Sequence, residues 1–316
     1  MDNANAVGRL RWGLCCQFLD APIRFRTATH RYVSGLAGPA GRAYLTDIAR
    51  DNAASLRAAV VQCAALGIGA FRMNSQILPL GTHPDSGYRL ADLDPKGAIA
   101  RAFRAAGALA RKHGVRLSFH PDQFVVLNSE REEVVRSGLT ELAFQAGIAR
   151  LVGADTMVVH GGGCAGGKAA ALDRLERGID RLAPEARARL ALENDDRQFT
   201  PADLLPLCDR TGVPLVYDVH HHRCNPDGAS VEEVTDAASV TWKGRGASDE
   251  QWVHISSPRD GWTAPNPRPH AACVDPEDFP AAWLGRALTI DVEAKAKERA
   301  VIAIRDAVAG AQVLAG

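Results

Sequence analysis

The chain has 316 residues, 46% of them hydrophobic, and its 37 lysines and arginines balance 37 aspartates and glutamates. This composition excludes a disordered chain, and the balanced charge argues against binding of polyanions by bulk attraction alone. The apolar stretches are short and interrupted, so we expect no transmembrane segment, and the N-terminus lacks the apolar run of a signal peptide. Seven scattered cysteines without a C-x-x-C pair favour a cytoplasmic location.

Short apolar runs alternate with longer helical segments along the chain. Near-continuous apolar runs are typical of parallel strands that are covered on both faces. We expect strands at Trp12–Gln17, Ala70–Asn74, Arg116–His120, Thr156–His160, Arg189–Glu193, Pro214–Val219, Gln251–Ile255 and Leu288–Glu293. We expect helices at Thr46–Leu66, Pro95–His113, Glu130–Val152, Lys168–Leu182, Pro201–Asp209, Val231–Ala238, Asp275–Leu284 and Ala296–Val308.

This alternation of strands and helices predicts an α/β fold, the (β/α)8 TIM barrel. No linker or repeat divides the chain, so a single domain spanning residues 1–316 is expected. An open, doubly wound sheet is the competing fold. It is disfavoured because the segment after the first strand, Gly13–Cys16, lacks the G-x-G-x-x-G phosphate loop.

Side chains that can bind metals fall at the ends of most predicted strands. The carboxyl ends of barrel strands meet at one mouth, so we expect these side chains to converge there. They are His120, His160, Glu193, Asp218, His221, His254 and Glu293, joined by His83 and His270 from loops at the same face. Carboxylates buried together without cations would repel one another, whereas imidazole and carboxylate are usual ligands of Zn, Mn and Fe(II). The pattern predicts a metal cluster, although each residue taken alone is more often a hydrogen-bonding strand end.

Asp218 and His221 impose a condition on this prediction. Side chains three positions apart in a strand point to opposite faces. The strand must therefore turn near Val219 or His220 if Asp218 and His221 are to bind together.

The motifs around these residues resemble those of the UV damage endonuclease family, a branch of the endonuclease IV-like and xylose isomerase-like barrels. The similar stretches are FRMNSQILPLGTHPDSGY, LSFHPDQFVVLNS, VVHGGG, LALENDDR, VYDVHHH, VHISSPRDG and IDVEAKAKE. The resemblance implies a DNA repair endonuclease that hydrolyses a phosphodiester on the 5′ side of a damaged site. Two or three divalent ions, commonly manganese with Zn, Fe or Mg as alternatives, would activate the water. The resemblance implies that the nine residues named above are ligands, and we expect His160, Glu193 and His254 to be central to catalysis.

The resemblance also implies contacts with DNA. In the family a glutamine–aromatic pair after the His-Pro motif probes the distorted duplex, and here this pair is Gln123 and Phe124. The alternative for Phe124 is core packing, because valines and a leucine follow it. We expect Arg259 in SSPRDG to bind a phosphate or the substrate. Damaged duplex DNA is thus the expected partner, and neither a membrane nor an obligatory protein partner is indicated.

Three positions depart from the family pattern. Trp252 stands where the family usually has a lysine that can be carboxylated and bridge metals, Leu14 replaces a tyrosine after Gly13, and the probing aromatic is Phe124 rather than tyrosine. These departures keep an alternative open, a metal-dependent barrel enzyme acting on a small molecule, such as a sugar isomerase-like or biosynthetic enzyme. In that case Trp252 and Trp262 would cover a closed pocket.

Overall fold

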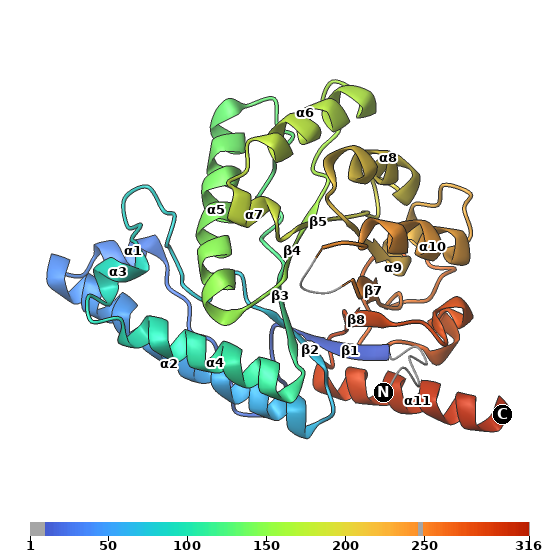
Figure 1. The fold of residues 1–316 in the computed structure, drawn as a ribbon, viewed down its shortest axis with the longest axis horizontal. Helices are drawn as coiled ribbons and strands as arrows, with labels where there is room; N and C mark the ends of the chain where they lie inside the picture. Colours follow the sequence, from blue (N-terminus) through green and yellow to red (C-terminus); the bar gives the residue numbers. More distant parts are fainter. Residues whose placement is uncertain (1–9, 246–248, 316) are drawn as a thin grey trace.

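The structure is a computed structural model that describes residues 10–245 and 249–315, so residues 1–9, 246–248 and 316 of the expected domain lie outside it. Its strands form a closed parallel barrel in the order β1 to β8 (Figure 1). The strands are β1 Leu10–Cys15, β2 Ala70–Met73, β3 Arg116–Phe119, β4 Thr156–His160, β5 Leu190–Glu193, β6 Leu215–Asp218, β7 Gln251–Ile255 and β8 Leu288–Val292. The predicted (β/α)8 barrel is confirmed.

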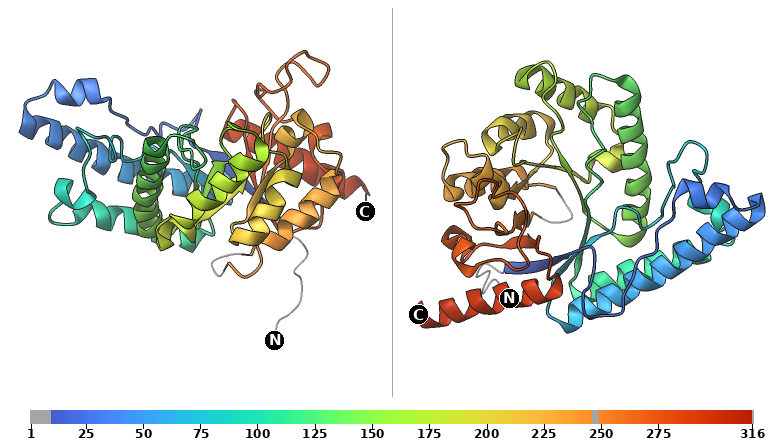
Figure 2. Two further views of the ribbon diagram at one scale, coloured as in Figure 1. Left: turned by 90° about the horizontal axis from the view of Figure 1, so that it is seen from above. Right: turned by 180° about the vertical axis from the view of Figure 1, so that it is seen from behind.

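Helices surround the barrel, and α1, α3 and the first part of α2 extend sideways beyond it (Figure 2). The helices are α1 His30–Ser34, α2 Gly38–Ala65, α3 Leu90–Leu93, α4 Ala98–His113, α5 Glu132–Val152, α6 Lys168–Asp180, α7 Pro184–Arg187, α8 Pro201–Thr211, α9 Val219–Cys224, α10 Val231–Thr241 and α11 Glu298–Ala315, with 3-10 turns η1 Pro276–Asp278 and η2 Ala281–Trp283. None of the helices in the described ranges has the length and apolar character needed to cross a membrane.

The helix predicted at Asp275–Leu284 is wrong, because the segment forms two short 3-10 turns. Pro280 lacks a backbone donor and disfavours the helical conformation at the residue before it. Phe279 accordingly has an extended backbone, with φ −71° and ψ 122°, and separates η1 from η2. A Pro inside an apparent helical pattern therefore ended the helix here.

The barrel interior is built in two layers that support the mouth. The lower layer is apolar: Trp252 packs there with side chains from four other strands, Ala70, Val158, Ala191 and Val216. Side chains two positions further along a strand point to the same face. The apolar layer therefore lies directly below a polar layer formed by His160, Glu193, Asp218 and His254.

This position of Trp252 corrects one expectation. Trp252 is fully buried within the barrel, so it does not cover a pocket at the mouth. Trp262 lies apart from it, in the loop after β7, and is 36% exposed.

Candidate metal centre at the barrel mouth

Glu193, the last residue of β5, lies at the centre of the polar layer and is fully buried. Its Oε2 lies 2.8 Å from Nε2 of His120 and 3.7 Å from Nε2 of His160. Its Oε1 lies 2.9 Å from Nδ1 of His254 and 3.5 Å from Nδ1 of His221. One carboxylate thus presents each of its oxygens to a different pair of imidazoles.

Glu293 extends the cluster from the end of β8. Its Oε1 lies 3.4 Å from Nδ1 of His254, and its Oε2 lies 3.6 Å from Nδ1 of His270. The guanidinium of Arg72, on β2, forms an ion pair with the same carboxylate. His270 reaches the cluster because its loop forms a bridge with Pro258, just after β7.

The turn required between Asp218 and His221 is present. β6 ends at Asp218 and α9 begins at the next residue, Val219. Asp218 caps this helix, because its Oδ1 accepts a hydrogen bond of 2.7 Å from the backbone N–H of His221. Its other oxygen, Oδ2, is buried, has no hydrogen-bond partner among residues 10–245 and 249–315, and lies 3.4 Å from Nδ1 of His221. The helix turn therefore brings both side chains into one site.

Backbone carbonyls orient two of the histidines. Nδ1 of His120 lies 3.1 Å from the carbonyl oxygen of Pro121, and Nδ1 of His221 lies 3.0 Å from that of Asn194. A carbonyl oxygen only accepts, so Nδ1 carries the proton and donates in both cases. When Nε2 is also protonated it donates, as Nε2 of His120 does to Oε2 of Glu193 at 2.8 Å; after loss of that proton, the lone pair on Nε2 can bind a cation.

The acids and imidazoles of the cluster shift one another's pKa. Burial opposes ionisation of Glu193, but the positive charges of His254 and His160 hold its pKa well below the usual range. Burial likewise opposes protonation of His254, yet the charge of Glu193 raises its pKa to about 9. The same balance, with Asp218 as the main acid, raises the pKa of His221 to about 9. Protons on the histidines thus neutralise carboxylates that a divalent cation could neutralise instead.

The donor set fits divalent cations. Ligand atoms of His120, His160 and Glu193 lie within 4.8 Å of one another, as do those of Glu193, Asp218, His254 and Glu293. Glu193 belongs to both groups, so two neighbouring ion positions would share it. A buried polar atom without a partner among the described residues, such as Oδ2 of Asp218, is rare unless a ligand completes it.

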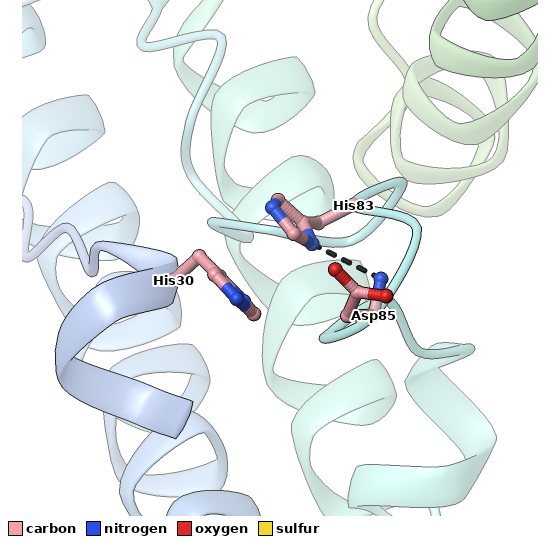
Figure 3. Close-up of side chains that lie close together, drawn as sticks. All are labelled: His30, His83 and Asp85. Carbon is pink, nitrogen blue, oxygen red and sulfur yellow. Dashed lines mark hydrogen bonds between the residues drawn. The ribbon is translucent and has the colours of Figure 1, made fainter. Parts of the chain in front are cut away.

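His83 is the expected ligand that the structure does not bring to this cluster. Its ring stacks on that of His30 from α1, with centroids 4.2 Å apart and an angle of 11° between the planes. Its Nδ1 accepts a hydrogen bond of 3.1 Å from the backbone N–H of Asp85 (Figure 3). It accepts a second hydrogen bond, of 3.3 Å, from the backbone N–H of Ser86. In this arrangement His83 stabilises its own loop beside α1.

The predicted DNA-contacting residues lie on the surface. Phe124 is 78% exposed, so the alternative of core packing is wrong, and Gln123 beside it is also exposed. A groove of about 330 Å³ adjoins Phe124, between the loop after β2 and helix α5. Arg259 is exposed, and its guanidinium forms an ion pair with Asp260 at 2.7 Å.

Two buried residues of the mouth were missed as parts of the cluster. Arg72 pairs with Glu293, and Asp291 lies 3.7 Å from His254. Both are charged residues in otherwise apolar strands, and strand alternation places Asp291 on the same face as Glu293. That alternation is the signal from which their inward orientation could have been predicted.

Comparisons with known proteins identify the family and the fold. The family model described as UV-endonuclease UvdE matches residues 10–314. The chain is 37% identical over 308 residues to the UV DNA damage endonuclease of Deinococcus radiodurans, covering 93% of this chain and 94% of that protein. It matches the solved structure of SacUVDE with a TM-score of 0.83 and 25% identity, covering 96% of this chain and 99% of that one. Endonuclease IV from Thermus thermophilus shares the fold, with a TM-score of 0.59 and 18% identity over 95% of this chain and 99% of that one. The chain therefore belongs to the UvdE family of UV endonucleases.

Proposed function

We propose that the protein is a metal-dependent DNA repair endonuclease that cleaves a duplex on the 5′ side of a damaged site. The observation that carries this proposal is the position of Glu193 between two groups of imidazoles at the barrel mouth. Membership of the UvdE family supplies the reaction class.

The centre would hold two divalent ions, with manganese as our proposed metal. Bound ions would lower the pKa of a coordinated water and neutralise charge on the phosphodiester oxygens. Glu193 would bridge the two positions, with His120 and His160 on one side and Asp218, His254 and Glu293 on the other. His221 and His270 would complete the ligand set from its edge.

The side chains of the three proposed catalytic residues differ in their exposure to solvent, which assigns them different roles. The side chains of His254 and Glu193 are 0% and 1% exposed, whereas that of His160 is 30% exposed. His160 is therefore the one of the three that a phosphodiester entering the mouth can touch. His254 and Glu193 would hold the ions beneath it.

Gln123 and Phe124 would probe the duplex beside this centre. An exposed aromatic ring can insert at a base step, and unstacking costs less where the base pair is damaged. Arg259 would contact a phosphate once its pair with Asp260 opens. The small-molecule alternative loses support because Trp252 is buried inside the barrel rather than at the mouth.

The test is incision of a 5′-labelled duplex oligonucleotide, irradiated or intact, by the manganese-loaded protein. We expect a nick on the 5′ side of the photoproduct, leaving a 3′-hydroxyl that a DNA polymerase extends directly. His160→Ala should abolish the nick while the thermal unfolding temperature stays close to that of the unmodified protein. Absence of incision by the unmodified protein at full metal loading would contradict the proposal.

A further inference from the structure

Asp291 on β8 is a carboxylic acid buried inside the barrel with no hydrogen-bond partner for either oxygen within the described residues. In the pairing of β7 with β8 it stands opposite His254, and in the pairing of β1 with β8 it stands opposite Gly13. A Cβ atom at Gly13 would lie 2.2 Å from Oδ1 of Asp291. Because Gly13 has no side chain, β1 leaves space for this carboxylate.

His254, which faces Asp291, has one ring nitrogen directed at the carboxylates of the cluster and one directed away from them. Its Nδ1 faces Glu193 and Glu293, at 2.9 Å and 3.4 Å, and is the atom that would bind an ion held by these carboxylates. Its opposite nitrogen, Nε2, is buried and has no hydrogen-bond partner in the part of the chain that the structure describes. Oδ2 of Asp291 lies 3.7 Å from this Nε2.

The other histidines show what Nε2 of His254 requires. A neutral imidazole that binds a cation through one nitrogen carries its proton on the other, and that N–H needs an acceptor. His120 and His221 donate theirs to the backbone carbonyls of Pro121 and Asn194. For His254 the structure shows Asp291 in the place of such a carbonyl.

We propose that Asp291 is a positioning residue of the metal centre, accepting a hydrogen bond from Nε2–H of His254 while Nδ1 binds an ion. The contact would shorten by roughly 0.8 Å to reach an ordinary N–H···O distance, a change within the range of side-chain rotation. Asp291 would thereby fix both the tautomer and the ring orientation of His254. This role rests on the proposed metal centre and adds a residue that the resemblance does not assign.

The test compares Asp291→Leu, which removes the acceptor, with Asp291→Asn, which keeps one. The control is Ser118→Ala, because Ser118 is another buried residue in a barrel strand, and its Oγ has no hydrogen-bond partner within the described ranges. Isothermal titration of the chelator-treated proteins with Mn²⁺ gives the affinity of each ion position, and elemental analysis gives the number of ions. Thermal unfolding of the chelator-treated proteins reports their stability.

We expect Asp291→Leu to weaken one ion position by about 10- to 100-fold, with Asp291→Asn between it and the unmodified protein. Ser118→Ala should bind ions normally. The chelator-treated Asp291→Leu variant should unfold at no lower temperature than the unmodified protein, because it loses a buried acid whose oxygens have no hydrogen-bond partner among the described residues and whose contact with His254 is long, at 3.7 Å. If Asp291 only stabilised the fold, replacing it by Leu would instead lower this unfolding temperature.

Two results would overturn the role of Asp291. In one, Asp291→Leu binds both ions as tightly as the unmodified protein, which leaves the proposed function intact. In the other, Asp291→Leu and Asp291→Asn bind ions equally weakly and both unfold at a lower temperature. If the unmodified protein itself binds no ion, the proposed metal centre fails and this role fails with it.

Discussion

Arg72 forms an ion pair with Glu293 inside the barrel, although 221 positions separate them in the sequence. The pair joins β2 to the end of β8 across the intervening strand β1. Both side chains are largely buried, at 11% and 14% exposure. The guanidinium is thus a permanent positive charge beside the carboxylate of Glu293.

Replacing Arg72 by Leu should destabilise the chelator-treated protein by about 3–5 kcal/mol, because Glu293 loses its buried cation. Added Mn²⁺ should restore part of this loss. Urea unfolding with and without the metal measures both effects. The control is Arg50→Ala, whose exposed pair with Asp47 should contribute less than about 0.5 kcal/mol. Equal losses of unfolding free energy in Arg72→Leu and Arg50→Ala would argue against a larger contribution of the pair between Arg72 and Glu293.

Glu193→Gln should lower metal binding at both ion positions, because Glu193 belongs to both ligand groups. Asp218→Asn should weaken only the position that it shares with His254 and Glu293. Both changes keep the side-chain shape. Elemental analysis of dialysed protein gives the number of ions bound per chain. We expect this number to be highest in the unmodified protein, lower in Asp218→Asn and lowest in Glu193→Gln. An unchanged metal content in Glu193→Gln would exclude the shared position.

Phe124→Ala should reduce the preference for irradiated over intact duplex without changing metal content or unfolding temperature. The ring is 78% exposed, so little folding free energy depends on it. Fluorescence anisotropy with the two duplexes measures the preference. Tyr32→Ala, another exposed aromatic side chain, located on α1, is the matched control. A similar loss in both variants would remove the specific role of Phe124.

His254, His221, Glu193 and Glu293 should together contribute most to the stability of the chelator-treated protein between about pH 4.5 and 6.5. The pKa values of His254 and His221 rise from 6.5 to about 9 in the folded state, so their contribution is complete below pH 6.5 and is lost as the pH rises through 9. The pKa values of Glu193 and Glu293 fall below 4.5, so their contribution is lost on acidification. Mn²⁺ should flatten the alkaline decline, because it binds the deprotonated histidines. Unfolding temperatures at pH 6.5 and 9, with and without Mn²⁺, check this; a flat profile without metal would contradict it.

His83→Asn should leave the number of bound ions unchanged if His83 stays beside His30, as the structure shows. Its amide oxygen can still accept from the loop N–H groups, whereas His160→Asn should lose metal. Elemental analysis compares the two variants. Loss of an ion in His83→Asn would instead restore the assignment implied by the family resemblance.

The strand-end residues could be predicted because the geometry of a parallel barrel brings the carboxyl ends of its strands together whatever the loops do. The inward orientation of Arg72 and Asp291 follows from the same alternation, applied to residues that precede the strand ends. The partner of His83 could not be predicted in this way. Its contact with His30 depends on how the loop after β2 packs against α1, a helix of five residues that is too short to show a periodic pattern.

The extent of α9 also escaped prediction, although the turn at Val219 was required. Six residues form this helix, and three of them are the histidines His220, His221 and His222. His222 contacts Asp227 and Tyr217, and His220 contacts the carbonyl of Arg268, so only His221 joins the cluster. Adjacent residues of the same type thus take different partners, which their spacing alone does not distinguish.

The indole of Trp252 has a consequence for which substitutions the barrel interior of this protein can accept. It fits the barrel interior because Ala70 and Ala191, which pack in the same layer, have small side chains. A single exchange of Trp252 for the family's usual lysine would leave a void and an unpaired ammonium below the cluster. A return to that lysine would therefore require coordinated replacement of several neighbours, which makes the present arrangement difficult to reverse one residue at a time.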